Sequence, residues 1–224
     1  MKIIGVIPAR KGSKSIKDKN IFKINRKSLI EYTFIEIKKS LLKESYILTD
    51  SQKIKNLSKP YKINSNYIRP NELSKDNTSL LSNLIHFDKW LEKNLIKYDY
   101  LLILQPTSPT RSFLDINEVI KILKKKKPNS LFSINNSAEH PYESIKIKNS
   151  KWSYTLPKAK QFYRRQDFDF ESFFINGAIY AIHKKIIKKK KLIGKKHILY
   201  KMPKIRSFDL NDFEDIEIIR KILK

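Results

Sequence analysis

The chain has 224 residues, no cysteine and a formal net charge of +26, which comes from 48 lysine and arginine residues against 22 aspartate and glutamate residues. A hydrophobic share of 40% is enough to build a core, so the composition excludes a globally disordered chain. The lack of cysteine excludes disulfides and thiolate metal sites, and the length predicts one domain over residues 1–224.

No stretch of the sequence is a long uncharged apolar run, so we expect no transmembrane helix and no membrane partner. The N-terminus enters an apolar segment directly, without a charged leader and a cleavage site, so we expect no signal peptide. Together with the missing cysteines, these features favour a cytoplasmic protein.

The positive charge invites a nucleic-acid partner, because neutralising phosphates drives non-specific binding to nucleic acids. The lysines, however, are spread over predicted helices, loops and both ends of the chain, and no zinc-finger, RNA-recognition or basic-zipper pattern is present. We therefore do not expect nucleic acid as a partner, and a basic nucleic-acid-binding protein is the alternative interpretation.

Apolar strands alternate with amphipathic helices over the first 134 residues. Continuous apolar runs predict strands at 2–8, 46–49, 98–105 and 130–134. Periodic apolar stripes predict helices at 28–39, after Ser51, at 80–93 and at 114–125. Residues 76–79 offer capping side chains for the third helix, which is expected to bury Leu81, Leu84, Ile85 and Trp90 or their neighbours. The alternation predicts an α/β fold with a mainly parallel sheet that helices cover on both faces.

Residues 135–175 break this pattern. Alternating residues on either side of Asn149-Ser150 predict a β-hairpin over 145–154, and residues 161–174 are dense in aromatic and charged side chains. Aromatic and arginine side chains favour protein interfaces, so we predict an excursion from the sheet that makes an oligomer contact. The sheet resumes at 176–182, a further strand is expected at 197–200, and an amphipathic helix is expected over 212–223.

The loop after the first strand concentrates positive charge around Gly12. Five basic residues fall within ten positions: Arg10, Lys11, Lys14, Lys17 and Lys19. Open α/β sheets bind ligands at the carboxyl ends of parallel strands, and a polyphosphate would neutralise this loop. A solvated basic turn explains the composition equally well. The loop lacks the glycine spacing of the dinucleotide-binding and P-loop motifs, so Arg10, Lys19 and loop amides would hold a phosphate.

Two later segments also place polar groups where strands end. Gln105 follows a buried strand and begins the segment Gln105-Pro106-Thr107-Ser108-Pro109. A neutral amide suits a sugar better than a phosphate, because it can both donate and accept hydrogen bonds. A structural proline turn explains the segment about as well. Asp209 and Asn211 follow the last predicted strand with a spacing that lets two oxygens meet one hard cation. The alternative is that Asn211 or Asp212 caps the final helix, and both interpretations can hold together.

Taken together, these segments resemble the bacterial cytidylyltransferases that activate nine-carbon acidic sugars, the CMP-N-acylneuraminate synthetase family, and within it the sialic and legionaminic acid branch. The matching segments occur in family order across nearly the whole chain. They are residues 7–14, 19–21, 49–51, 69–70, 105–109 with Arg111, and 176–180.

The resemblance implies a mixed, mainly parallel sheet of the nucleotide-diphospho-sugar transferase type, and a homodimer whose subunits exchange the middle excursion. It also implies a Mg2+-dependent reaction between CTP and a nonulosonic acid, a nine-carbon 2-keto acidic sugar. The anomeric hydroxyl of the sugar would attack the α-phosphorus, and the products would be the CMP-sugar and pyrophosphate.

The matched positions imply roles for individual residues. Near the triphosphate the resemblance places Arg10, Gly12, Ser13 and Lys19, and near the cytidine Asn20, Arg69 and Ser79. For the sugar it places Gln105 and Asn176, with Arg165 of the neighbouring subunit reaching the sugar carboxylate. Asp209 and Asn211 match the metal-binding pair. The expected catalytic groups are Arg10, Lys19 and Asp209.

Three positions depart from the family pattern. Asn211 stands where the family has a second metal-binding aspartate, Phe174 where an arginine is common, and Glu143 where a lysine often follows the His-Pro pair. The last two lie in the predicted sugar region, so the nature of the sugar stays open. A catalytically inactive nucleotide- or sugar-binding relative is the third interpretation.

Overall fold

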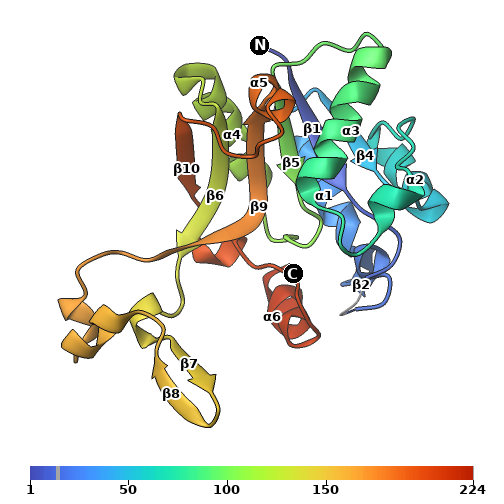
Figure 1. Cartoon of the computed structure of the whole chain (residues 1–224). Helices are drawn as coiled ribbons and strands as arrows, with labels where there is room; N and C mark the ends of the chain where they lie inside the picture. Colours follow the sequence, from blue (N-terminus) through green and yellow to red (C-terminus); the bar gives the residue numbers. More distant parts are fainter. Residues whose placement is uncertain (14–15, 224) are drawn as a thin grey trace.

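The fold is built on one six-stranded mixed sheet (Figure 1). The structure is a computed structural model that describes residues 1–13 and 16–223. In spatial order the strands are β10 (His197–Lys201), β6 (Ser130–Asn136), β9 (Phe173–His183), β5 (Tyr100–Leu104), β1 (Ile3–Pro8) and β4 (Glu44–Leu48). β9 is antiparallel to β5 and β6, and the other pairings in this sheet are parallel. The expected mixed, mainly parallel sheet is confirmed.

The central strands β1 and β5 are buried on both faces, which explains their unbroken apolar sequences. In β1, Ile7 belongs to one core cluster while its neighbour Val6 belongs to another on the opposite face. In β5, Leu102 belongs to the same cluster as Ile7, and Leu101 belongs to the same cluster as Val6. Successive side chains of a strand point to opposite faces, so a strand between two cores needs apolar residues at every position.

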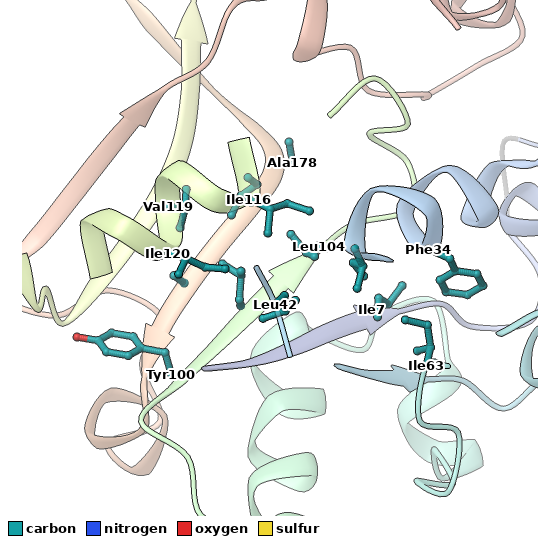
Figure 2. Packing of buried hydrophobic residues seen from close by; sticks show 14 of the residues in the cluster. Ile7, Phe34, Leu42, Ile63, Tyr100, Leu104, Ile116, Val119, Ile120 and Ala178 are labelled. Carbon is teal, nitrogen blue, oxygen red and sulfur yellow. The ribbon is translucent and has the colours of Figure 1, made fainter. Parts of the chain in front are cut away.

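Helices cover both faces of the sheet, as the alternating pattern predicts. The first core cluster contains residues of α1 (Leu29–Lys39), α2 (Gln52–Ser58) and α4 (Phe113–Lys126), and Figure 2 shows α4 side chains beside β5 and β9. The second cluster contains residues of α3 (Leu80–Lys93) and α5 (Lys184–Lys188). None of the helices in the described part of the chain has the length and apolar character needed to cross a membrane.

The buried face of α3 differs from the predicted one. Leu84 is buried as expected, but Leu81, Ile85 and Trp90 are only partly buried. The fully buried positions of this helix are Asn83, Leu84, Phe87, Asp88 and Leu91. The two polar residues can lie inside because each is hydrogen-bonded: Asp88 accepts from a tyrosine hydroxyl at 2.6 Å, and Asn83 donates to a main-chain carbonyl at 3.0 Å.

A third apolar cluster joins the two ends of the chain. It contains Ile16 and Leu210, together with residues of the short hairpin strand β2 (Lys23–Ile24) and of α6 (Glu214–Ile222). β2 pairs with β3 (Lys27–Ser28), which leads into α1. At the start of α6, Asp212 Oδ1 accepts the main-chain N–H of the residue two positions later at 3.0 Å, which supports the capping interpretation for this residue.

Between β6 and β9 the chain leaves the sheet and projects away from it (Figure 1). The predicted hairpin is confirmed as the antiparallel pair β7 (Ile145–Lys148) and β8 (Lys151–Tyr154). Behind it, aromatic rings pack edge to face or stacked on one another. They belong to His140, Tyr142, Phe162, Phe168 and Phe170. This part of the chain therefore has a small apolar cluster of its own.

Candidate active site

A cavity of about 310 Å3 lies at the carboxyl ends of β1 and β5, beside the basic loop. Its wall comes from three parts of the chain, within residues 8–20, 69–83 and 105–107. Most of the predicted nucleotide-binding residues line it, together with Gln105, which was predicted to hold the sugar. They are Arg10, Gly12, Ser13, Lys19, Asn20 and Arg69. Lys14 of the same loop lies outside the described residues.

The basic loop is held in place by main-chain and amide contacts. Gly12 has a φ of +77°, a left-handed conformation that glycine adopts without strain. The Lys11 N–H donates to Asp50 Oδ1 at 2.6 Å, just beyond β4. The side-chain amide of Asn20 donates to the Arg10 carbonyl at 3.1 Å. These contacts fix the path of the loop and hence the position from which Arg10 faces the cavity.

Lys19 connects the basic loop to the far end of the chain. Its Nζ donates to the carbonyl oxygens of Leu210 at 2.8 Å and Asn211 at 2.9 Å. Burial lowers the pKa of Lys19, while the charge of the neighbouring Asp209 acts in the opposite direction. The amino group therefore lies between the cavity and the segment that contains Asp209.

Asp209 is a half-buried carboxylate with an unsatisfied oxygen. Its Oδ1 is buried and has no hydrogen-bond partner in the part of the chain that the structure describes. Burial raises the pKa of Asp209, while the Thr107 hydroxyl and the Lys19 ammonium favour the charged form. The Leu210 N–H donates to the Thr107 carbonyl at 2.8 Å, which ties this segment to the loop after β5. Asp209 thus lies behind the Thr107 and Lys19 wall of the cavity.

The residues present fit a magnesium ion. Mg2+ binds proteins through one or two carboxylates and takes its other ligands from water and substrate phosphates. The unpartnered, buried Oδ1 of Asp209 is an oxygen donor of the type that a hard cation prefers. The Asn211 side chain is exposed two residues further on and offers an amide oxygen. Among the described residues, no three or more histidine, cysteine, aspartate or glutamate side chains are grouped to hold a metal.

The wall formed by residues 69–83 positions two arginine side chains. Arg69 is buried, and its Nε donates to the Leu73 carbonyl at 2.9 Å while its Nη2 contacts the same oxygen. The Arg10 guanidinium forms an ion pair with Asp76 across the cavity mouth. Both cations are therefore oriented by the protein itself, which lowers the cost of reorganisation when an anion binds.

Arg111 fixes the loop that carries Gln105. Its side chain is fully buried, and Nη1 donates to the carbonyl oxygens of Gln105 at 3.0 Å and Ala178 at 2.9 Å. Nη2 donates to the Thr33 hydroxyl at 2.7 Å, and burial lowers the pKa of Arg111 to about 10. On the neighbouring strand β9, Gly177 has a φ of +73°, and a Cβ there would lie 3.9 Å from the Gln105 amide. Arg111 thus fixes the main chain at Gln105, and Gly177 leaves room beside the Gln105 side chain.

Besides Asp209 and Asn211 of the expected metal pair, three predicted site residues are not among the described residues that line the cavity: Ser79, Asn176 and Arg165. The Ser79 hydroxyl accepts the Ser82 N–H at 3.0 Å and caps α3. Asn176 is buried, and its Oδ1 accepts from the Ser133 hydroxyl at 2.6 Å. Arg165 lies on the excursion, where it pairs with Glu139 and Glu143, each at 2.8 Å. Their roles toward cytidine and sugar stay predictions.

Sequence reasoning missed five polar or charged residues of the cavity wall. They are Lys75, Asp76, Thr78, Asn83 and Thr107. For residues 76–78 the capping interpretation requires no contact with a ligand. Asn83 gives no signal in the sequence, because the apolar stripe predicted for its helix passes through Leu84 and Ile85 and does not include it.

The cavity lies at the carboxyl ends of parallel strands, where open α/β sheets bind ligands, and its excess of arginine and lysine side chains suits an anionic ligand. The sequence matches the model of the family described as "Cytidylyltransferase" over residues 4–221. The chain belongs to this cytidylyltransferase family.

Curated relatives and solved structures agree with the assignment. N-acylneuraminate cytidylyltransferase of Streptococcus agalactiae is 28% identical over 219 residues, which is 96% of this chain and 52% of the relative. CMP-N,N'-diacetyllegionaminic acid synthase of Legionella pneumophila is 31% identical over 125 residues, 55% of this chain and 54% of the relative. The chain therefore spans about half the length of these curated relatives.

Among solved structures, a CMP:2-keto-3-deoxy-manno-octonic acid synthetase complexed with CTP superimposes with a TM-score of 0.70 at 14% identity. The match covers 100% of this chain and 98% of that chain. At this identity the likeness establishes the fold, and it agrees with the mixed sheet described above.

Proposed function

We propose that this protein transfers a cytidylyl group from CTP to a nine-carbon 2-keto acidic sugar, a sialic, legionaminic or related nonulosonic acid. The products would be the CMP-sugar and pyrophosphate. The observation that carries the proposal is the cavity that unites Arg10, Lys19 and Arg69 beside the half-buried carboxylate of Asp209. Family membership and the names of the relatives support cytidine as the base and acidic sugars as acceptors.

The chain's own residues supply charge stabilisation and alignment. Nucleotidyl transfer depends on holding the nucleophile in line with the leaving group and on stabilising charge that grows on phosphate oxygens. Arg10 and Lys19 are the cations placed to do this for the triphosphate. Gln105, an amide with both donor and acceptor, faces the same cavity and suits sugar hydroxyls.

Asp209 would hold a Mg2+ ion, with Asn211 as a second oxygen donor. When bound, the ion would neutralise phosphate charge as a Lewis acid. Lys19 lies between this carboxylate and the cavity, so its amino group would contact the phosphate side of the ligand while its carbonyl partners keep it in place.

A homodimer is part of the proposal. On the excursion, Trp152 is 64% exposed and Tyr163 is 95% exposed, and both border a hollow of about 600 Å3 that also includes Arg165. Exposed apolar patches of this kind mark contact surfaces. We propose that a second copy of the chain covers this hollow. We also propose that the protein acts in the cytoplasm, with CTP as the donor.

The test is to incubate the purified protein with CTP, Mg2+ and a panel of acidic sugars that includes N-acetylneuraminate, N,N'-diacetyllegionaminate and an eight-carbon 2-keto acid. Pyrophosphate release that requires both CTP and a nine-carbon sugar is the expected result. Binding of CTP without turnover of any sugar would identify an inactive relative instead. Failure to bind CTP at all would overturn the proposal.

A further inference from the structure

Asn83 differs from the other polar residues of the cavity because its side-chain amide is buried and only one of its two polar atoms has a hydrogen-bond partner among the described residues. It lies in the first turn of α3 and is 3% exposed, yet it forms part of the cavity wall. Its Nδ2 donates to the Ser79 carbonyl at 3.0 Å. A carbonyl oxygen can only accept, so this bond fixes which way round the amide lies.

The other end of the same amide has no partner. Asn83 Oδ1 is buried without a hydrogen bond to any residue that the structure describes. Leaving a buried acceptor unpaired is costly, and such groups in folded proteins are ordinarily satisfied by protein, water or ligand. Because Asn83 forms part of the cavity wall, a ligand that carries an N–H or O–H donor would satisfy this acceptor.

The surroundings of Asn83 favour a base over a phosphate. The wall residues nearest to it in the sequence, Leu80 and Thr78, carry no charge. The charged residues Arg69, Lys75 and Asp76 lie earlier in the same wall, and Arg10 and Lys19 lie on the loop after β1. A phosphate at neutral pH offers only acceptors and would be repelled by Oδ1. A pyrimidine base with an exocyclic amino group presents the N–H donor that Oδ1 lacks.

We propose that Asn83 is a specificity-determining residue of the nucleotide site, and that its Oδ1 accepts a hydrogen bond from the exocyclic amino group of cytosine. The inference rests on the proposed CTP-dependent function. Uracil carries a carbonyl oxygen in place of that amino group, so two acceptors would face each other and UTP would be rejected. Polar groups that are left unpaired by the wrong ligand are an effective source of discrimination.

The experiment measures binding of three nucleotides by calorimetry, to the wild type and to Asn83→Leu, which is similar in size and removes the acceptor. The nucleotides are CTP, UTP and a CTP analogue with hydrogen in place of the amino group. We expect Asn83→Leu to weaken CTP binding about 10-fold, to leave the analogue unchanged, and to leave UTP unchanged or bound more tightly. The CTP-to-UTP affinity ratio should therefore fall about 10-fold or more.

Asn94→Leu is the matched control, because Asn94 ends the same helix and is exposed away from the cavity wall. It should leave the CTP-to-UTP ratio unchanged. If Asn83→Leu does not fold, as judged by its thermal unfolding, Asn83→Ala makes the same test with a smaller change.

Equal weakening of all three nucleotides would show a structural or ribose role and would overturn the inference, as would an unchanged ratio. These results differ from a failure of the proposed function itself. In that case the wild type would not prefer CTP at all, and the comparison of variants would have no starting preference to lose.

Discussion

At the scale of single residues, Asp209 and Lys19 are two charged side chains whose partial burial is unfavourable. Burial raises the pKa of the Asp209 carboxyl and lowers the pKa of the Lys19 ammonium, so for both groups it disfavours the charged form. Their mutual attraction offsets only part of this effect. Charged groups whose pKa values are shifted in this way are candidates for contacts with a ligand or a metal ion, because such contacts would offset the free-energy cost of burial.

The substitution Asp209→Asn separates the effect of this carboxylate on stability from its proposed effect on catalysis. Because the folded-state pKa is raised, the carboxylate destabilises the empty fold at neutral pH, and a neutral amide of the same shape removes that cost. We expect an unchanged or higher melting temperature without ligand, together with a fall in kcat of about 100-fold or more through loss of transition-state charge stabilisation. Thermal unfolding and pyrophosphate release are the two measurements.

Asp212→Asn is the control for this variant. Asp212 lies on the same segment, is exposed, and uses its Oδ1 to cap α6, which an asparagine also does. Its kcat should stay within twofold of the wild type. Full activity in Asp209→Asn would contradict the role proposed for Asp209.

At the scale of elements, the start of α4 anchors the chain that leads to Asp209. Asp115 is fully buried and accepts hydrogen bonds from Ser112, which caps α4, and from the Tyr200 hydroxyl at 2.9 Å. The Arg206 guanidinium donates to both of its carboxylate oxygens, at 2.8 and 3.0 Å. One carboxylate therefore joins α4 to β10 and to the segment that follows it.

Asp115→Ala should lower the free energy of unfolding by about 2–4 kcal/mol, because it leaves the Tyr200 hydroxyl and the half-buried Arg206 charge without their partner. Urea denaturation followed by circular dichroism measures the change. Glu118→Ala on the same helix removes only an exposed ion pair with Lys121 and should cost about 0.5 kcal/mol or less. Equal effects of the two substitutions would refute the anchoring role.

At the scale of the whole molecule, the excursion is the feature that one copy of the chain leaves unexplained. Its hairpin residues Ile147 and Trp152 are 73% and 64% exposed, in a chain whose cores are otherwise well covered. The excursion also has an aromatic cluster of its own, in which the rings of Tyr142, Phe162 and Phe168 pack on one another. A second copy of the chain is the partner that we propose for this surface.

The proposed homodimer predicts a particle of twice the chain mass of 26.6 kDa in light scattering. Trp152→Lys puts a charge into the apolar contact and should give a monomer with unchanged circular dichroism. Leu95→Lys, at an apolar residue that is 88% exposed after α3, should leave the dimer intact. A wild-type protein that runs as a monomer at micromolar concentration would exclude the dimer.

The net charge of +26 also acts at this scale. A strongly positive protein attracts anionic ligands from a distance, and a cavity lined by Arg10, Lys19 and Arg69 concentrates that field. The positive charge therefore favours the approach of small anionic ligands and does not require a nucleic-acid partner.

By itself the sequence determined the features that depend on neighbouring residues. Unbroken apolar runs marked β1 and β5, apolar periodicity marked α1 and α4, and the crowded cations beside Gly12 marked a loop that lines the cavity. These signals are local, because strand and helix periodicity and turn chemistry are set within about a dozen positions. The order of the motifs then identified the family.

Only the tertiary structure decided what depends on residues far apart in the chain. These features are the antiparallel insertion of β9 between β5 and β6, the contact of Lys19 with the Asp209 segment, and the burial of Asn83. Whether a polar side chain is capped, solvated or left unpaired depends on which distant strand or helix covers it. For this reason the cationic half of the site could be predicted, while the position of Asn83 in its wall could not.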